Sequence, residues 1–231
     1  GAWVQDQVTG EASLLESISL LCYSAAFTEK MKLGVSVIVF PTRNAVQLAK
    51  SIGTLDHMSH GRAILGSGLG PPAKSSSFYQ SFGFEYSQRL RRFNEGLKVM
   101  KALWTESAAD FDGEFYRLRA TAMEPKPIQT PHPPIWVGGP SDAAMRRTVR
   151  YGDAWHPIRI QMDWFKNTGI PRLKEISDEE AKSVPELCPR IRLRLTDSPV
   201  TGSDRVVGEG GIDLVHRGLA ELAPQGSSYD I

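Results

Sequence analysis

The sequence is poor in the features that mark several protein classes. Its two cysteines, Cys22 and Cys188, are far apart, which argues against a disulfide framework and predicts two idle thiols. Lys plus Arg (27) nearly balances Asp plus Glu (26), and a formal net charge of +1 gives no strong attraction to nucleic acid or a membrane surface. The longest apolar runs, such as Val35 to Phe40, are far shorter than the roughly 18 residues of a spanning helix. No basic and then apolar signal segment opens the chain. We therefore expect a soluble, cytoplasmic, globular protein.

Metal-binding and several common catalytic patterns are also missing. None of the five histidines forms a pair with metal-ligand spacing and a third ligand nearby, so no metal site is predicted. There is no Gly-x-Ser-x-Gly nucleophile elbow and no P-loop. The glycines from Gly66 to Gly70 lack the spacing of a dinucleotide fingerprint, and no acidic ribose partner follows at the usual interval.

What the chain does contain is a regular alternation of short apolar segments and longer helical patterns. This alternation is typical of a parallel sheet with crossover helices. We predict strands at about 3–6, 32–40, 63–67, 134–139, 152–157, 190–196 and 228–231. Helices are predicted at about 14–28, 45–55, 89–104, 141–151, 162–184 and 212–223, with Asn44 as an N-cap. The segment 71–77 is predicted to be a loop.

The alternation predicts an α/β fold, a (β/α)8 TIM barrel that forms a single domain over residues 1–231. An excursion at about 108–134 interrupts it and begins with a hairpin at 111–116. A closed barrel needs eight strands, whereas we count seven and the chain opens inside a strand. We therefore expect the first strand and helix of the barrel to be absent from this sequence.

Ligands of parallel barrels gather at the carboxyl ends of the strands, so candidate residues are sought there. Gly138-Gly139-Pro140-Ser141 joins a strand to a helix, and its backbone amides are placed to bind an anion. A tight turn with Ser141 as a plain N-cap is the structural alternative. Arg146 and Arg147 follow and add positive charge. The small residues around Gly68 would let a flat ring approach the sheet end.

Several segments together resemble the luciferase-like monooxygenase family, including its branch that uses the deazaflavin F420. The resemblance covers nearly the whole chain, and it depends on the order and spacing of segments that are weak alone. These segments are 32–37, 48–50 with 54–56, 59–62 leading into 65–68, 89–104, 112–116, 133–139 and 152–155.

The resemblance implies a barrel with an isoalloxazine-type ring across the strand ends. Ser36-Val37 matches a non-proline cis peptide that presses against the ring, Asp6 a ring-side carboxylate, and 138–141 the cofactor phosphate loop. An ordinary trans bond and a loop-capping Asp are the alternatives for the first two. The cofactor-binding residues are thus expected to be Asp6, Ser36, Val37, Gly68, Leu69, Gly70, Val137, Gly138, Gly139, Pro140 and Ser141.

The chain also departs from part of the family. F420-dependent sugar-phosphate dehydrogenases carry a His where this chain has Gln7 and a Glu where it has Pro71. Those residues do acid–base work on the substrate, so this activity is not expected here. Gln7 and His156 stand as substrate-side candidates, with a structural histidine as the alternative for His156. No catalytic acid or base is identified.

The expected function is hydride transfer between F420 and a small organic substrate, with the ring supplying the redox chemistry. An FMN-dependent monooxygenase is the first alternative. A flavin-binding protein without turnover and a phosphate-sugar barrel enzyme without a redox cofactor are alternatives of other classes. The loop 71–81 and the excursion 111–134 are predicted to close over the substrate. Family precedent predicts a homodimer, with no nucleic acid or membrane partner.

Overall fold

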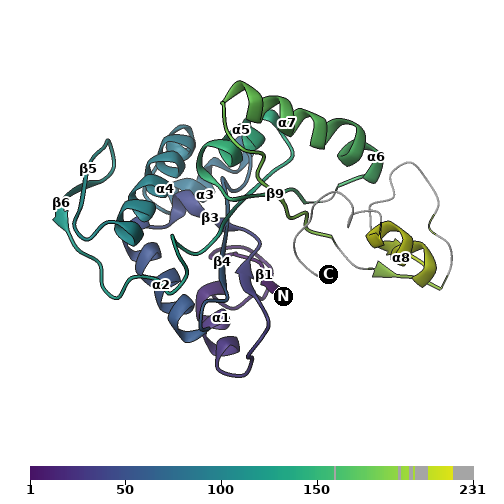
Figure 1. Ribbon diagram of the computed structural model, residues 1–231, viewed down its shortest axis with the longest axis horizontal. Helices are drawn as coiled ribbons and strands as arrows, with labels where there is room; N and C mark the ends of the chain where they lie inside the picture. Colours follow the sequence, from purple (N-terminus) through teal and green to yellow (C-terminus); the bar gives the residue numbers. More distant parts are fainter. Residues whose placement is uncertain (159, 192–193, 198–199, 201–207, 221–231) are drawn as a thin grey trace. The chain divides into compact units, whose positions relative to one another are not determined.

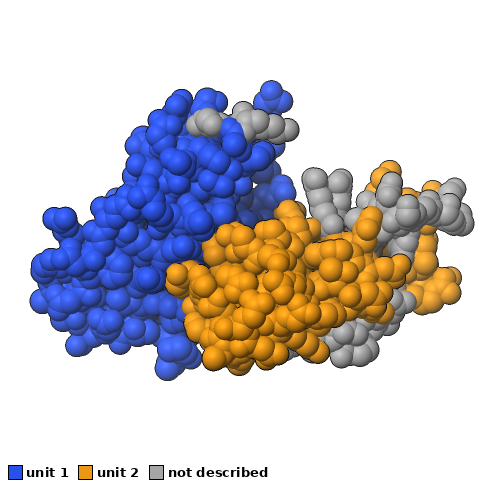
Figure 2. All heavy atoms as spheres, turned by 90° about the horizontal axis from the view of Figure 1, so that it is seen from above, with its two compact units in different colours: residues 1–135 blue, residues 136–231 orange. Residues whose placement is uncertain are grey.

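The structure, a computed structural model, describes residues 1–158, 160–191, 194–197, 200 and 208–220. The chain forms two compact units, Gly1–Ile135 and Trp136–Ile231, which Figure 2 distinguishes by colour. The prediction of a single domain stays a prediction, and the strand predicted at 228–231 lies outside the described residues. No helix in the described part of the chain is long and apolar enough to cross a membrane.

A parallel sheet forms the core of the first unit. Strand β2 (Leu33–Val35) pairs with β1 (Ala2–Val4) on one side and β4 (Ala63–Gly68) on the other. A further strand, β3 (Ile38–Val39), pairs with the carboxyl end of β4. The prediction of one continuous strand at 32–40 is wrong, because a cis peptide between Ser36 and Val37 separates β2 from β3. That cis peptide itself confirms an expectation from the family resemblance.

The helices of this unit begin largely where the capping residues predict. The side chain of Asn44 accepts hydrogen bonds from the amides of Val46 (3.0 Å) and Gln47 (3.2 Å), and α2 follows it. The predicted loop at 71–77 is wrong, because a 3₁₀ turn and a short helix occupy it. The helical segments are α1 (Ser17–Ala25), η1 (Phe40–Thr42), α2 (Ala45–Met58), η2 (Ala73–Ser75), α3 (Ser76–Gln80), η3 (Tyr86–Gln88) and α4 (Arg89–Thr105).

The excursion contains the predicted antiparallel hairpin, β5 (Ala109–Asp112) and β6 (Arg117–Thr121). The Glu95 carboxylate of α4 accepts hydrogen bonds from three successive amides of the hairpin, those of residues 114–116, at 2.7–3.0 Å. The Tyr116 hydroxyl in turn accepts a hydrogen bond from the amide of Ala45, the first residue of α2. Figure 1 shows the hairpin of β5 and β6 beside α4. These bonds fix the hairpin on α2 and α4 and weigh against the lid role predicted for it.

The second unit is built on strands β7 (Ile135–Gly138), β8 (Ala154–His156) and β9 (Glu186–Leu187), which pair in parallel in that order. The helical segments are α5 (Asp142–Tyr151), α6 (Met162–Trp164), the π-helical η4 (Phe165–Gly169) and α7 (Ile170–Glu179). Trp155 of β8 is fully buried and packs in one apolar cluster with Phe165 and Leu173. This cluster supports β8 and the helices beside it.

The end of the chain departs most from prediction. Within the strand expected at 190–196, Arg194–Leu195 form a strand and residues 192–193 lie outside the described residues, but the strand that pairs with β8 is β9, a few residues earlier. Two residues are too few to show an alternating pattern. A separate pair of parallel strands, β10 (Arg194–Leu195) and β11 (Glu209–Gly210), precedes α8 (Ile212–Ala220). Both cysteines are free, as predicted. The parallel α/β architecture is confirmed.

Candidate functional site

The predicted anion loop joins β7 to α5 and lies within the second unit. Val137 is buried in β7, Gly138 and Gly139 are half-buried, and Pro140 and Ser141 are exposed. Gly139 has a backbone φ of +115°, a conformation that side-chain-bearing residues rarely adopt. Ser141 is the N-cap of α5, and its hydroxyl oxygen accepts a hydrogen bond from the amide of Ala144 (3.3 Å). The loop therefore presents the first amides of α5 at an accessible surface.

A buried tryptophan, Trp155, binds this loop from the interior of the unit. The indole N–H of Trp155 donates a hydrogen bond of 2.8 Å to the carbonyl oxygen of Gly139. The indole ring stacks on Phe165, with centroids 5.6 Å apart and planes 27° apart. A Cβ atom on Gly169 would lie 3.0 Å from Trp155, so a glycine there leaves room for the ring. The loop is thereby attached to the buried apolar cluster of this unit.

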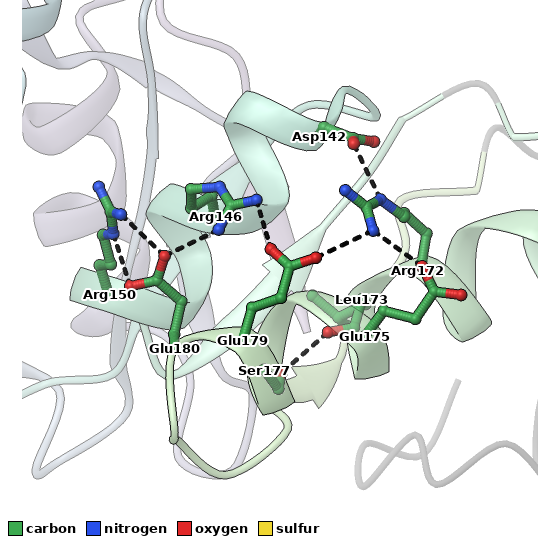
Figure 3. A network of polar contacts seen from close by, with 9 residues as sticks. All are labelled: Asp142, Arg146, Arg150, Arg172, Leu173, Glu175, Ser177, Glu179 and Glu180. Carbon is green, nitrogen blue, oxygen red and sulfur yellow. Dashed lines mark hydrogen bonds and ion pairs between the residues drawn. The ribbon is translucent and has the colours of Figure 1, made fainter.

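Acidic and basic side chains alternate along α5 and α7 beside the loop (Figure 3). Asp142, in the first turn of α5, pairs with Arg172 of α7 at 2.8 Å, and Arg172 also pairs with Glu175 at 2.8 Å. Hydrogen bonds to Glu175 and Asp142 raise the pKa of the Arg172 guanidinium. Arg172 thus offsets part of the negative charge that Asp142 brings to the start of α5, and it shares its own charge with Glu175 and Glu179.

The sequence predicts that Arg146 adds positive charge beside the loop, but its guanidinium is paired with carboxylates at the end of α7. Its guanidinium pairs with Glu179 (2.7 Å) and Glu180 (2.9 Å), and Arg150 pairs with Glu180 (2.7 Å). Hydrogen bonds from Arg150 and Arg146 lower the pKa of Glu180 to about 2. Arg146 and Arg150 thus bind α5 to the end of α7, and the first amides of α5 are the groups of the loop that can attract an anion.

The predicted ring-side residues of the first unit gather at the carboxyl end of β4. Ser36 is buried, and its amide donates to the carbonyl oxygen of Val4 at 2.8 Å. The Val37 side chain lies over β4, since a Cβ atom on Gly68 would be 2.6 Å from Val37 Cγ2. The glycine at 68 therefore makes room for Val37, and Val37 stands where the sequence predicts a flat ring to approach.

The segment after β4 is fixed by a buried tyrosine. The Tyr79 hydroxyl lies 2.6 Å from the carbonyl oxygen of Pro71, to which it donates, and 3.0 Å from that of Leu69. Burial raises the pKa of Tyr79 to about 12. Leu69 is half-buried and Gly70, at a φ of +85°, is exposed, so the loop offers a small apolar surface on a fixed base.

Asp6 is fully engaged by protein donors. Its side chain is only 2% exposed and pairs with Arg43 at 2.6 Å. The Val39 amide (3.0 Å) and the Ser17 hydroxyl (3.2 Å) also donate to it. Asp6 thus ties the ends of β1 and β3 to the start of α1, which is the loop-capping alternative; a contact with a ring stays a prediction.

The two substrate-side candidates lie in different surroundings. Gln7 is half-buried, and its side chain fills the space beside Gly10. His156 is 3% exposed at the end of β8, with its ring centroid 5.2 Å from that of Trp136. His156 Nδ1 contacts the carbonyl oxygen of Cys188, which can only accept, so Nδ1 carries the proton of the neutral ring. Burial lowers the pKa of His156 to about 4.

We expect His156 to make the protein less stable in mild acid. Its pKa rises from about 4 in the folded protein to the ordinary 6.5 on unfolding, so the unfolded chain binds the extra proton. Stability should be full above pH 6.5 and fall as the pH drops from 6.5 to 4, by about 3 kcal/mol in all. Urea unfolding of wild type and His156→Gln across this range measures the effect. Parallel curves for the two proteins would contradict it.

The chain was compared with known proteins. The family model of luciferase-like monooxygenases matches residues 1–196, and the chain belongs to this family. An uncharacterized protein of Mycobacterium tuberculosis is 31% identical over 93% of this chain and 82% of its own length. An FMNH(2)-dependent dimethylsulfone monooxygenase of Pseudomonas putida is 32% identical over 61% of this chain and 38% of its own length.

Solved structures agree on the fold. The monooxygenase RslO1 from Streptomyces bottropensis superposes with a TM-score of 0.73 at 19% identity, over 97% of this chain and 66% of its own. The coenzyme F420 dependent tetrahydromethanopterin reductase from Methanopyrus kandleri gives 0.70 at 18% identity, over 85% and 58%. This chain therefore spans only about two thirds or less of those chains. The predicted fold class, a luciferase-like (β/α)8 TIM barrel, is confirmed.

Sequence reasoning missed three residues that shape the candidate loops. Trp155, Arg172 and Tyr79 each act on a partner that is distant along the chain or on another element. No spacing rule predicts such a bond. Among the described residues, no group of three or more His, Cys, Asp or Glu side chains could hold a metal ion.

Proposed function

We propose that this protein is an oxidoreductase that uses F420 for hydride transfer to or from a small organic substrate. The observation that carries the proposal is the loop from Gly138 to Ser141 at the start of α5, in a chain that belongs to the luciferase-like family. The bound ring would supply the two-electron chemistry. The chain's own residues would bind, orient and shield it.

The donor set of the loop fits a phosphate. The amides of Ser141 and Asp142 stand at the first turn of α5, where no intrahelical acceptor exists for them. The Ser141 oxygen already accepts a bond from Ala144, which leaves the hydroxyl proton for a ligand. Asp142 is paired with Arg172, whose guanidinium also binds Glu175 and Glu179. A phosphate here would thus meet amide and hydroxyl donors, and the ion pair with Arg172 would reduce its repulsion by Asp142.

We propose that the cofactor ring contacts two segments of the first unit, the one around Ser36 and Val37 and the one from Gly68 to Gly70. Val37 and Leu69 are apolar and half-buried, as a surface that receives the face of a flat ring should be. Asp6 would have an indirect role, because its carboxylate binds Arg43 and the Val39 amide and so fixes their positions. Segment 71–81 remains the proposed cover over the substrate, and a homodimer in the cytoplasm remains a prediction from the resemblance.

The proposal is tested by adding F420 and FMN separately to the purified protein and following absorbance and fluorescence. We expect saturable binding with tighter affinity for F420. Riboflavin, which has the flavin ring without the phosphate, should bind at least tenfold more weakly than FMN, because only FMN can use the loop. Tight FMN binding with indifference to F420 would favour the FMN-dependent monooxygenase instead.

Turnover separates the enzyme from a flavin-binding protein. With reduced F420 and a panel of small ketones and unsaturated compounds, we expect oxidation of the cofactor that depends on the acceptor. Ring binding without oxidation by any acceptor or by oxygen would favour the protein without turnover. Binding of neither ring would favour the phosphate-sugar enzyme without a redox cofactor.

A further inference from the structure

The peptide between Gly139 and Pro140 poses an electrostatic problem for an anion-binding loop. Proline has no N–H, so this peptide contributes a carbonyl oxygen and no donor. A carbonyl oxygen that faced a bound phosphate would repel it, beside the backbone amides that would donate to the phosphate. Something must therefore keep the Gly139 oxygen turned away from the ligand.

The structure contains a group that does this. The Trp155 indole N–H donates to the Gly139 carbonyl oxygen at 2.8 Å, from the interior side of the loop. Trp155 is fully buried, stacked on Phe165 and packed against Gly169, so its indole has little freedom to follow a moving carbonyl. Gly139, at a φ of +115°, has the backbone conformation that this orientation of the loop uses.

We propose that Trp155 is a positioning residue for the cofactor phosphate. By holding the Gly139 carbonyl inward, it keeps the amides on either side of Pro140 turned outward before the ligand arrives. This inference rests on the proposed function, because it concerns the same loop. It adds a residue that does not touch the ligand, and it predicts an effect confined to ligands that carry a phosphate.

The test compares Trp155→Phe with Trp164→Phe in the full chain. Phe keeps an aromatic ring at this position but removes the N–H donor together with part of the buried indole, which is why a second Trp→Phe variant is needed as a control. Trp164 lies in the same aromatic cluster, 6.2 Å from Trp155 between centroids, so it controls for loss of an indole from this core. The probes are FMN and riboflavin, which differ only by the phosphate, with F420 as a second phosphate-bearing ligand.

We expect Trp155→Phe to weaken FMN and F420 binding about tenfold and to change riboflavin binding less than twofold. Trp164→Phe should leave all three affinities within twofold of wild type. Equal weakening of FMN and riboflavin by Trp155→Phe would show a purely structural role and overturn the inference, as would unchanged FMN binding. If wild type itself binds FMN no better than riboflavin, the proposed phosphate loop fails, and this inference fails with it.

If Trp155→Phe does not fold, a second substitution tests the same hydrogen bond. Replacing Trp155 with benzothienylalanine exchanges the indole N–H for sulfur and keeps the shape of the side chain. The same selective tenfold loss for phosphate-bearing ligands is expected. In wild type, the indole N–H resonance of Trp155 should also shift on addition of FMN and stay unmoved with riboflavin. A shift of equal size with both ligands would contradict a role directed at the phosphate.

Discussion

Replacing Arg62 with Met is expected to lower the free energy of unfolding by about 4 kcal/mol. Arg62 is only 6% exposed, and its guanidinium donates to several carbonyl oxygens at and after the ends of α1 and α2. These acceptors are Ser59 O (2.6 Å), Thr28 O (2.6 Å), Met31 O (2.7 Å) and Ala25 O (3.4 Å), with the Thr28 hydroxyl at 2.9 Å. Met would fill the space and leave these groups without a donor. A urea unfolding curve measures the loss.

Arg62→Lys is the matched variant. Lysine keeps the positive charge but has one ammonium group in place of the planar fork, so it reaches fewer of these acceptors. We expect an intermediate loss, closer to that of Met than to wild type. A change below about 1 kcal/mol in Arg62→Met would show that the end of α1 does not depend on these bonds.

A single added methyl group at Gly66 is expected to destabilise the protein by about 3 kcal/mol. A Cβ atom there would lie 1.9 Å from the carbonyl oxygen of Val35 in the neighbouring strand β2. The obstacle is backbone, which cannot rotate away, so β2 and β4 must separate to admit Gly66→Ala. The melting temperature should fall by roughly 10 °C or less, given the size of the chain.

The same substitution at Gly53 should act in the opposite direction. Gly53 lies in the interior of α2, and the nearest atom to an added Cβ is Pro127 Cγ at 3.8 Å, an ordinary contact distance. Alanine has the higher helix propensity, so Gly53→Ala should stabilise by about 0.5–1 kcal/mol. A lower melting temperature for Gly66→Ala together with a higher one for Gly53→Ala would support the close approach of β2 and β4 at Gly66. Equal, small shifts would contradict it.

Local chemistry accounts for the elements that the sequence predicts well. Asn44 and Ser141 are N-caps with ordinary side-chain bonds, and the apolar run that ends in Gly68 forms β4 as expected. The pattern fails where the deciding contact is not local. An apolar segment from 32 to 40 looks like one strand, because hydrophobicity carries no signal for the break between Ser36 and Val37.

The candidate site also has features that the adjacent sequence predicts and features that it does not. Paired glycines before a capping Ser predict the loop at 138–141, because the amides and the helix terminus are properties of the adjacent sequence. Charge is harder to predict, since Arg146 pairs with Glu179 and Glu180 at the end of α7, more than thirty residues away. Which partner a surface Arg chooses depends on packing between helices, and no spacing in the sequence encodes that packing.

The account depends most on one claim, that the amides after Val137 hold the phosphate of a redox cofactor. Amide NMR of the 25.5 kDa protein, labelled with ¹⁵N and titrated to saturation with F420, tests it directly. The account predicts that the amide protons of Gly139, Ser141 and Asp142 shift downfield, as amides do on donating to an anion, while that of Gly83 in the first unit stays in place. If the absorbance of F420 shows that binding is saturated and the resonances of these three amides have not shifted, the account is contradicted.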